Sequence, residues 1–238
     1  MQALIFDTEF TWPAGFETAD KNGSVRIPHP PNAVIESIAF VSITGEEVKL
    51  GTMKGATERD RVGVFVTSWA KNKPTMVSFN GRCADVPLLL ARCIHHRIVP
   101  GPWTFDVGFA NRYRSPHHVD LYDVLGCYGA NRSGGLHDWA RCVGWPGKMG
   151  TTGDDVAALL KTPNGRAFVD AYCLADAVQT AAVWLRFCLL TGSEGVGPEK
   201  YARLAANLHK AALADERTRA VAELVDIETW IGAAREAA

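Results

Sequence analysis

The sequence lacks a strong net charge. Its 25 lysine and arginine residues are balanced by 26 aspartate and glutamate residues, which gives a formal net charge of -1. Proteins that coat duplex nucleic acid are usually strongly basic, so this balance disfavours a binder with a long nucleic-acid footprint. It is compatible with a protein that contacts only a few nucleotides.

The sequence also lacks paired cysteines, internal repeats and a long apolar run. Its six cysteines form no C-x-x-C pair, and a chain of this size needs no disulfide bonds, so we expect reduced thiols and a cytoplasmic location. The first ten residues carry no basic region, so we expect no signal peptide. No stretch of about 18 apolar residues is present, so we expect no membrane span.

The sequence does contain an apolar share of 47%, which is enough for a sizeable core. Apolar patterning predicts strands at 2–6, 34–43, 47–53 and 75–79, and helices at 58–71, 85–97, 134–143, 153–161 and 165–190, followed by two helices within 199–237. Glycine and proline predict a loop at 12–31 and a linker at 193–198. We therefore predict an α/β domain over residues 1–192, with a mixed sheet flanked by helices, and a helical C-terminal extension over 193–238 packed on it.

Acidic residues occur where the buried elements are predicted to end. Asp7 and Glu9 follow the first apolar strand, and residues two apart on a strand point to the same face. Asp85 begins the helix that follows strand 75–79. Tyr172 and Asp176 are four residues apart on the long helix and therefore share one face. Each feature alone is commonly a turn, a helix cap or chance.

Together the four carboxylates predict a metal site. Asp176 interrupts an apolar stretch of its helix, and a buried unpaired carboxylate is unfavourable unless a cation neutralises it. Hard divalent cations prefer carboxylate oxygens to thiols or imidazoles. Two such cations about 4 Å apart activate a water and stabilise the leaving oxygen in phosphodiester hydrolysis. The residues therefore favour metal-dependent phosphodiester chemistry.

Three motifs resemble those of the DEDD exonucleases, the superfamily that includes polymerase proofreading domains. Residues 5–9 (IFDTE) resemble the first motif, residues 79–89 (FNGRCADVPLL) the second, and residues 172–176 (YCLAD) the third in its tyrosine subtype. Residues 118–125 and 144–148 strengthen the resemblance. It spans about residues 2–192 and is closest to the predicted exonuclease family related to the proofreading domain of family B DNA polymerases.

The resemblance implies an RNase H-like fold and a 3′→5′ exonuclease that releases 5′-mononucleotides from single-stranded 3′ ends, with DNA favoured. It implies that Asp7, Glu9, Asp85 and Asp176 hold two Mg²⁺ or Mn²⁺ ions and that Tyr172 orients the attacking water. A 3′→5′ exoribonuclease is the first alternative, since no residue separates DNA from RNA. A non-catalytic nuclease-fold module that binds strand ends is the second, and the intact acidic set argues against it.

Four further residues are candidate substrate contacts. Phe10 can stack on a terminal base or pack in the core, and Asn80 can bind substrate or finish its strand in a turn. Arg82 can contact a phosphate or remain solvated. Lys148 can touch the substrate backbone. The acidic and histidine residues of 118–123 fit the capped start of a helix better than a metal site.

Overall fold

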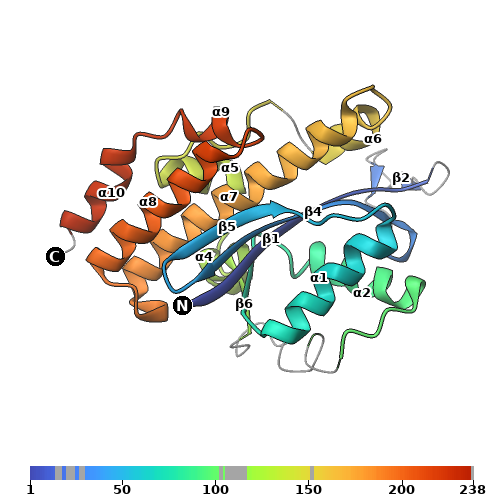
Figure 1. Cartoon of the computed structure of the whole chain (residues 1–238), viewed down its shortest axis with the longest axis horizontal. Helices are drawn as coiled ribbons and strands as arrows, with labels where there is room; N and C mark the ends of the chain where they lie inside the picture. The colour runs from blue at the N-terminus through green and yellow to red at the C-terminus, as the bar shows by residue number, and fades with distance from the viewer. Residues whose placement is uncertain are drawn as a thin grey trace.

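The computed structural model describes residues 1–13, 18–19, 25–26, 30–101, 104, 117–150 and 153–236. They form a five-stranded mixed sheet in the order β5-β4-β1-β6-β7, with helices on both faces (Figure 1). The strands are β1 (Gln2–Thr11), β4 (Val34–Thr44), β5 (Glu47–Thr52), β6 (Thr75–Ser78) and β7 (His118–Asp120). This architecture confirms the predicted α/β fold.

The central strand, β1, pairs antiparallel with β4 and parallel with β6. Its alternate residues divide between two cores: Ala3 and Ile5 face one, and Leu4 and Phe6 face the other. The apolar run ends at Phe6, but pairing with β4 continues to Thr11. The strand is therefore longer than predicted, because the ladder to β4 continues where the apolar pattern stops.

One face of the sheet is covered by α1 (Glu58–Asn72) and α2 (Asp85–His96) (Figure 1). Helix α2 buries Leu88 and Leu89 against this face and leaves Ile94 exposed. Both helices, α1 and α2, begin and end close to the predicted residues.

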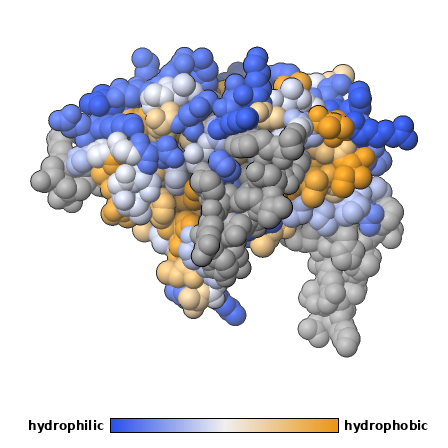
Figure 2. Space-filling view, turned by 90° about the horizontal axis from the view of Figure 1, so that it is seen from below, coloured by the Kyte–Doolittle hydropathy of each residue, from blue (hydrophilic) through white to orange (hydrophobic). Residues whose placement is uncertain are grey.

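Figure 2 shows the surface of the molecule from below, where hydrophilic residues predominate over the upper part and hydrophobic residues form smaller patches.

The other face is covered by α7 (Gly165–Thr191), which packs against β1 and β4. It ends as predicted at Gly192, whose φ of 67° is the left-handed conformation common after a helix. Contrary to the expectation of no membrane-length segment, α7 is long and apolar enough to span a membrane. However, 72% of its most apolar window is buried inside the fold, as in the core helix of a globular protein.

The C-terminal segment packs on α7 as three helices rather than the predicted two. They are α8 (Pro198–Ala214), α9 (Arg219–Ala222) and α10 (Ile227–Glu236). A turn separates α8 from α9, because Thr218 donates to the Ala212 carbonyl and Asp215 accepts from the Arg217 amide. Trp230 of α10 is fully buried in the core formed with α7.

Shorter elements complete the described chain. They are β2 (Thr18–Ala19), β3 (Val25–Arg26), α4 (Leu121–Leu125), α5 (Leu136–Cys142), α6 (Val156–Leu159) and 3-10 turns at Pro30–Asn32, Cys127–Gly129, Gly153–Asp155 and Ser193–Gly195. β2 and β3 pair within the predicted loop, much of which lies outside the described residues. Asp120 caps α4 by accepting from the Tyr122 amide, as the spacing predicted, but the three-residue strand β7 before it was not predicted.

Candidate functional site

Three carboxylates from two distant segments meet between the sheet and α7. Asp7 and Glu9 lie in the second half of β1, on the face that packs against α7, and Asp176 lies on α7 itself. One carboxylate oxygen of each residue lies within 4.8 Å of the others. The convergence follows from the strand period, since residues two apart share a face, and from the packing of α7 across β1.

Glu9 and Asp176 are buried and Asp7 is half-buried, so this carboxylate group is electrostatically unfavourable without a counter-charge. Burial raises the pKa of Asp7, and the charges of Glu9, Asp85 and Asp176 raise it further. Burial and the Asp176 charge raise the pKa of Glu9 to about 8. Asp7 Oδ2 is buried and receives no hydrogen bond from the described part of the chain. An unsatisfied carboxylate oxygen beside two other carboxylates fits a hard divalent cation, which takes oxygen ligands.

Asp85 approaches the group from the other side of the sheet. It is the first residue of α2, and its Oδ1 accepts a hydrogen bond from Thr8 Oγ1. Thr8 points to the opposite face of the sheet from Asp7 and Glu9. Because Asp85 is bonded to Thr8, it lies beside the group of three rather than within it. Burial raises the pKa of Asp85 to about 6, and the Thr8 hydroxyl opposes that rise. The structure therefore gathers three of the four predicted metal ligands and places the fourth next to them.

A turn after β6 sets the position of Asp85. Asn80 adopts a left-handed conformation with φ 64°. Asp120, at the end of β7, accepts hydrogen bonds from the backbone amides of Asn80 and Arg82, each at 2.8 Å. A side chain on Gly81 has no space, because its Cβ would lie 2.6 Å from Ser78 Cβ and 2.9 Å from Asp85 Oδ2. Sequence reasoning missed the roles of Asp120 and Gly81, which depend on β7 lying next to β6.

Two predicted substrate contacts make contacts within the fold. The Arg82 guanidinium donates to Asp123 Oδ2 at 3.1 Å and to the His118 carbonyl at 3.3 Å, so it is engaged within the fold. Phe10 lies on the α1 and α2 side of the sheet, packs against the core there, and has its ring centroid 6.0 Å from that of Trp12.

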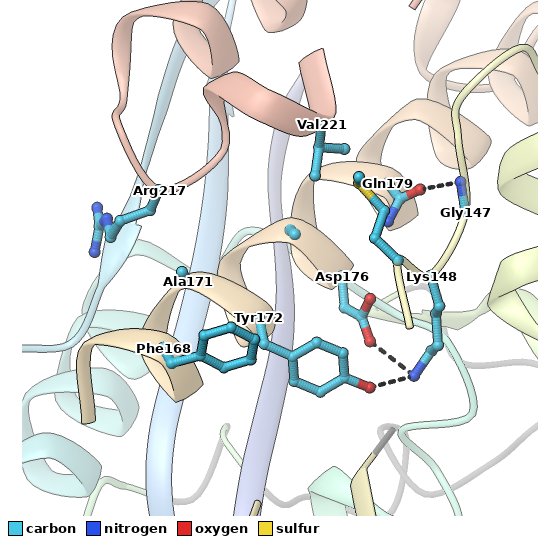
Figure 3. A pocket seen from close by; sticks show the side chains of 11 residues that line it. Gly147, Lys148, Phe168, Ala171, Tyr172, Asp176, Gln179, Arg217 and Val221 are labelled. Carbon is cyan, nitrogen blue, oxygen red and sulfur yellow. Dashed lines mark hydrogen bonds and ion pairs between the residues drawn. The ribbon is translucent and has the colours of Figure 1, made fainter. Parts of the chain in front are cut away.

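Lys148 reaches the site, and its ammonium lies between Tyr172 and Asp176 (Figure 3). The Nζ atom is 2.9 Å from Asp176 Oδ2 and donates to the Tyr172 hydroxyl at 2.6 Å. Burial lowers the pKa of Lys148, but the Asp176 charge and the Tyr172 hydroxyl outweigh it, so the net shift is upward. Asp176 therefore has a counter-charge from the chain itself: burial raises its pKa, and the Lys148 charge opposes the rise.

The loop that carries Lys148 is held to α7 and α5. The Gly147 amide donates to Oε1 of the buried Gln179 at 2.7 Å, and the Lys148 amide donates to His137 Nδ1 at 3.1 Å. Gly147 has a φ of 79°, and a Cβ there would lie 2.7 Å from the His137 ring. Glycine is therefore required for the loop to approach α5 closely enough to place Lys148.

Comparisons with known proteins agree with this geometry. Residues 27–226 match the family described as predicted 3'-5' exonuclease related to the exonuclease domain of PolB, and the chain belongs to that family. The matched range contains Asp85, Tyr172 and Asp176 and begins after Glu9. It also extends into the C-terminal helices.

One similar solved structure is the family B DNA polymerase from the hyperthermophilic archaeon Pyrobaculum calidifontis. The TM-score is 0.57 at 16% identity, over 90% of this chain and 29% of the polymerase chain. The likeness therefore concerns the fold, and this chain spans less than a third of the polymerase. No curated protein matches the sequence.

Proposed function

We propose that the protein is a metal-dependent 3′→5′ exonuclease that removes 5′-mononucleotides from single-stranded nucleic acid, with DNA as the favoured substrate. The observation that carries the proposal is the largely buried group of Asp7, Glu9 and Asp176, in which one carboxylate oxygen of each residue lies within 4.8 Å of the others. The family assignment supports the same reaction direction.

Asp7, Glu9, Asp85 and Asp176 are proposed to hold two divalent cations, Mg²⁺ or Mn²⁺. Bound there, such cations lower the pKa of a water molecule and neutralise the phosphate. The contribution of the chain is to keep the four carboxylates together despite their repulsion. β1, α2 and α7 do this through the sheet ladder and the Thr8 contact.

Tyr172 is proposed to orient the attacking water. Lys148 donates to the phenol oxygen at 2.6 Å, and the phenol proton is left to act as a donor, which in this structure is directed to Asp176. Burial raises the pKa of Tyr172, so the phenol keeps that proton at neutral pH and acts as a hydrogen-bond donor rather than a base. Lys148 in turn places a positive charge next to the position where the scissile phosphate would lie.

The test is hydrolysis of a 5′-labelled single strand in Mn²⁺, run in parallel on DNA and RNA of the same sequence, with a circular single strand as control. A ladder of shortened products with the circle intact supports the proposal. Faster shortening of the RNA would make the protein an exoribonuclease. Cleavage of the circle, or no product from either strand, would contradict exonuclease activity.

A further inference from the structure

The loop that carries Lys148 belongs to no helix or strand, so its position depends on single contacts. Two backbone amides hold its far end: Gly147 donates to Gln179, and Lys148 donates to His137. The near end is held by a side chain, because Trp145 is only 2% exposed and lies in the core formed with α7 and the C-terminal helices. The place of the Trp145 ring therefore affects where Lys148 lies.

The Trp145 ring packs against Trp230 of α10. The two ring centroids lie 5.3 Å apart and the ring planes make an angle of 86°, an edge-to-face arrangement that aromatic pairs favour. The backbone of the loop also comes close, since a Cβ on Gly144 would lie 3.9 Å from Trp230 Cβ. Through Trp230, the C-terminal helices therefore reach the loop that carries Lys148.

Trp230 is itself attached to α7, the helix that carries Tyr172 and Asp176. Its carbonyl accepts one hydrogen bond from Arg186 Nη2 of α7 at 2.9 Å and another from the Tyr201 hydroxyl of α8 at 3.1 Å. Arg186 Nε also donates to the Tyr201 hydroxyl at 3.0 Å, and Trp230 is fully buried. The loop and the carboxylate site are therefore supported by the same helix.

The position of the loop matters because Lys148 makes short contacts in the site. Its Nζ atom is 2.9 Å from Asp176 Oδ2 and 2.6 Å from the Tyr172 hydroxyl. A displacement of about 1 Å would take the Asp176 contact beyond hydrogen-bonding distance, and misplacement on this scale can slow a reaction by about 10²-fold. A smaller residue in place of Trp230 would leave a void into which the loop can move.

We propose that Trp230 is a positioning residue, which acts through Trp145 to fix the loop and hold the Lys148 ammonium against Tyr172 and Asp176. Because it is fully buried, Trp230 contributes to the reaction without touching the substrate. The proposal rests on the proposed function, in which Lys148 lies beside the scissile phosphate. Trp230 lies beyond residue 226, where the family match ends, so the matched family pattern does not include it.

The first readout of the test needs no hydrolysis. Amide hydrogen exchange in EDTA follows the Gly147 and Lys148 amides in the wild type and in Trp230→Leu. Loss of the indole ring should speed exchange at both amides by roughly 2- to 12-fold, the range that one aromatic pair contributes to an equilibrium, and leave the β1–β4 ladder unchanged. Val62→Ala is the control, because Val62 is fully buried in the core on the opposite face of the sheet, and it should lower the Tm without affecting the loop.

The second readout is kcat on single-stranded DNA in Mn²⁺, measured in a double-mutant cycle with Lys148→Met. Trp230→Leu should lower kcat by roughly 10²-fold in the wild-type background and cause no further loss beside Lys148→Met, because both changes act through the same ammonium group. Trp230→Phe keeps an aromatic ring, so both readouts should be intermediate. This variant also carries the test if leucine prevents folding.

Unchanged exchange at the Gly147 and Lys148 amides in a folded Trp230 variant would overturn the proposal, as would losses of kcat that add in the double mutant. The exchange measurement is informative whether or not the exonuclease assay succeeds. Failure of the positioning role and failure of the proposed function are therefore distinguishable.

Discussion

Without bound cations, the stability of the protein is predicted to fall as the pH rises from 6.5 to 8. Burial beside other carboxylates raises the pKa of Glu9 from 4.5 to about 8. Between these values the folded protein keeps a proton on Glu9 that the unfolded chain has released. The stability contributed by this proton is complete below pH 4.5 and is lost as the pH rises through about 8.

The size of this loss of stability follows from the part of the Glu9 titration that lies between pH 6.5 and 8. One pKa unit corresponds to about 1.4 kcal/mol, so the Glu9 carboxyl accounts for a loss of about 2 kcal/mol between pH 6.5 and 8. That is roughly 4–8 °C in Tm for a chain of this size. The window starts at 6.5 because burial lowers the pKa of His118 from 6.5 to about 3, which gives the opposite trend at lower pH.

The assay is thermal or denaturant unfolding in EDTA across this pH window for the wild type and for Glu9→Gln. The substitution removes the titrating group, so the pH dependence should shrink by the amount calculated above. Glu47→Gln is the control, because Glu47 is exposed and forms a surface ion pair with Lys49, and it should keep the wild-type trend. Saturating Mn²⁺ should raise the Tm and weaken the trend, since it favours ionised carboxylates. Equal pH dependence in wild type and Glu9→Gln would refute the reasoning.

Three further substitutions test separate parts of the site. Tyr172→Phe should keep the Mn²⁺-induced rise in Tm and slow hydrolysis by ~10²–10⁴-fold, because only the orienting hydroxyl is lost; wild-type turnover would exclude this role. Gly81→Ala should destabilise the fold by about 1–3 kcal/mol and displace Asp85. Gly232→Ala is the control, because a Cβ at Gly232 would meet no atom within 4 Å, and it should leave stability unchanged. Coinciding unfolding curves of the wild type and Gly81→Ala would contradict the steric account. Asp120→Ala leaves two backbone amides of the turn after β6 without their acceptor, so it should lower both Tm and kcat. An unchanged kcat would show that the turn does not position Asp85.

Much of the fold was predictable because local patterns are strong where elements are long. The 27 residues of α7 are mostly apolar and are followed by Gly192, and β4 and β5 pair around a turn at Gly45. β7 was missed because three residues are too few to show a period. The break between α8 and α9 was missed because Thr218 and Asp215 produce it by hydrogen bonds that a pattern of alanines does not reveal.

The parts of the candidate site that lie within a single strand or helix were predictable from the sequence. The spacing of Asp7 and Glu9 placed both on one face of a strand, and the structure shows them there. Relations between elements were not predictable. The ion pair of Lys148 with Asp176 joins a loop to a helix 28 positions away, and no local pattern specifies that contact. Val221 of α9 lines a cavity together with Tyr172 and Asp176, and this depends in the same way on how the C-terminal helices pack.

The central claim is that the buried carboxylate group performs 3′→5′ hydrolysis, and release of a 3′-terminal label tests it most directly. The wild type and Asp7→Asn are purified identically and incubated in Mn²⁺ with a 3′-labelled single-stranded DNA. Asparagine preserves the shape of Asp7 but removes its negative charge. In the described structure the Oδ2 atom of Asp7 receives no hydrogen bond. We predict that the wild type releases the label as a mononucleotide and that folded Asp7→Asn releases none. Retention of the label by the wild type, or equal release by the variant, would contradict the claim.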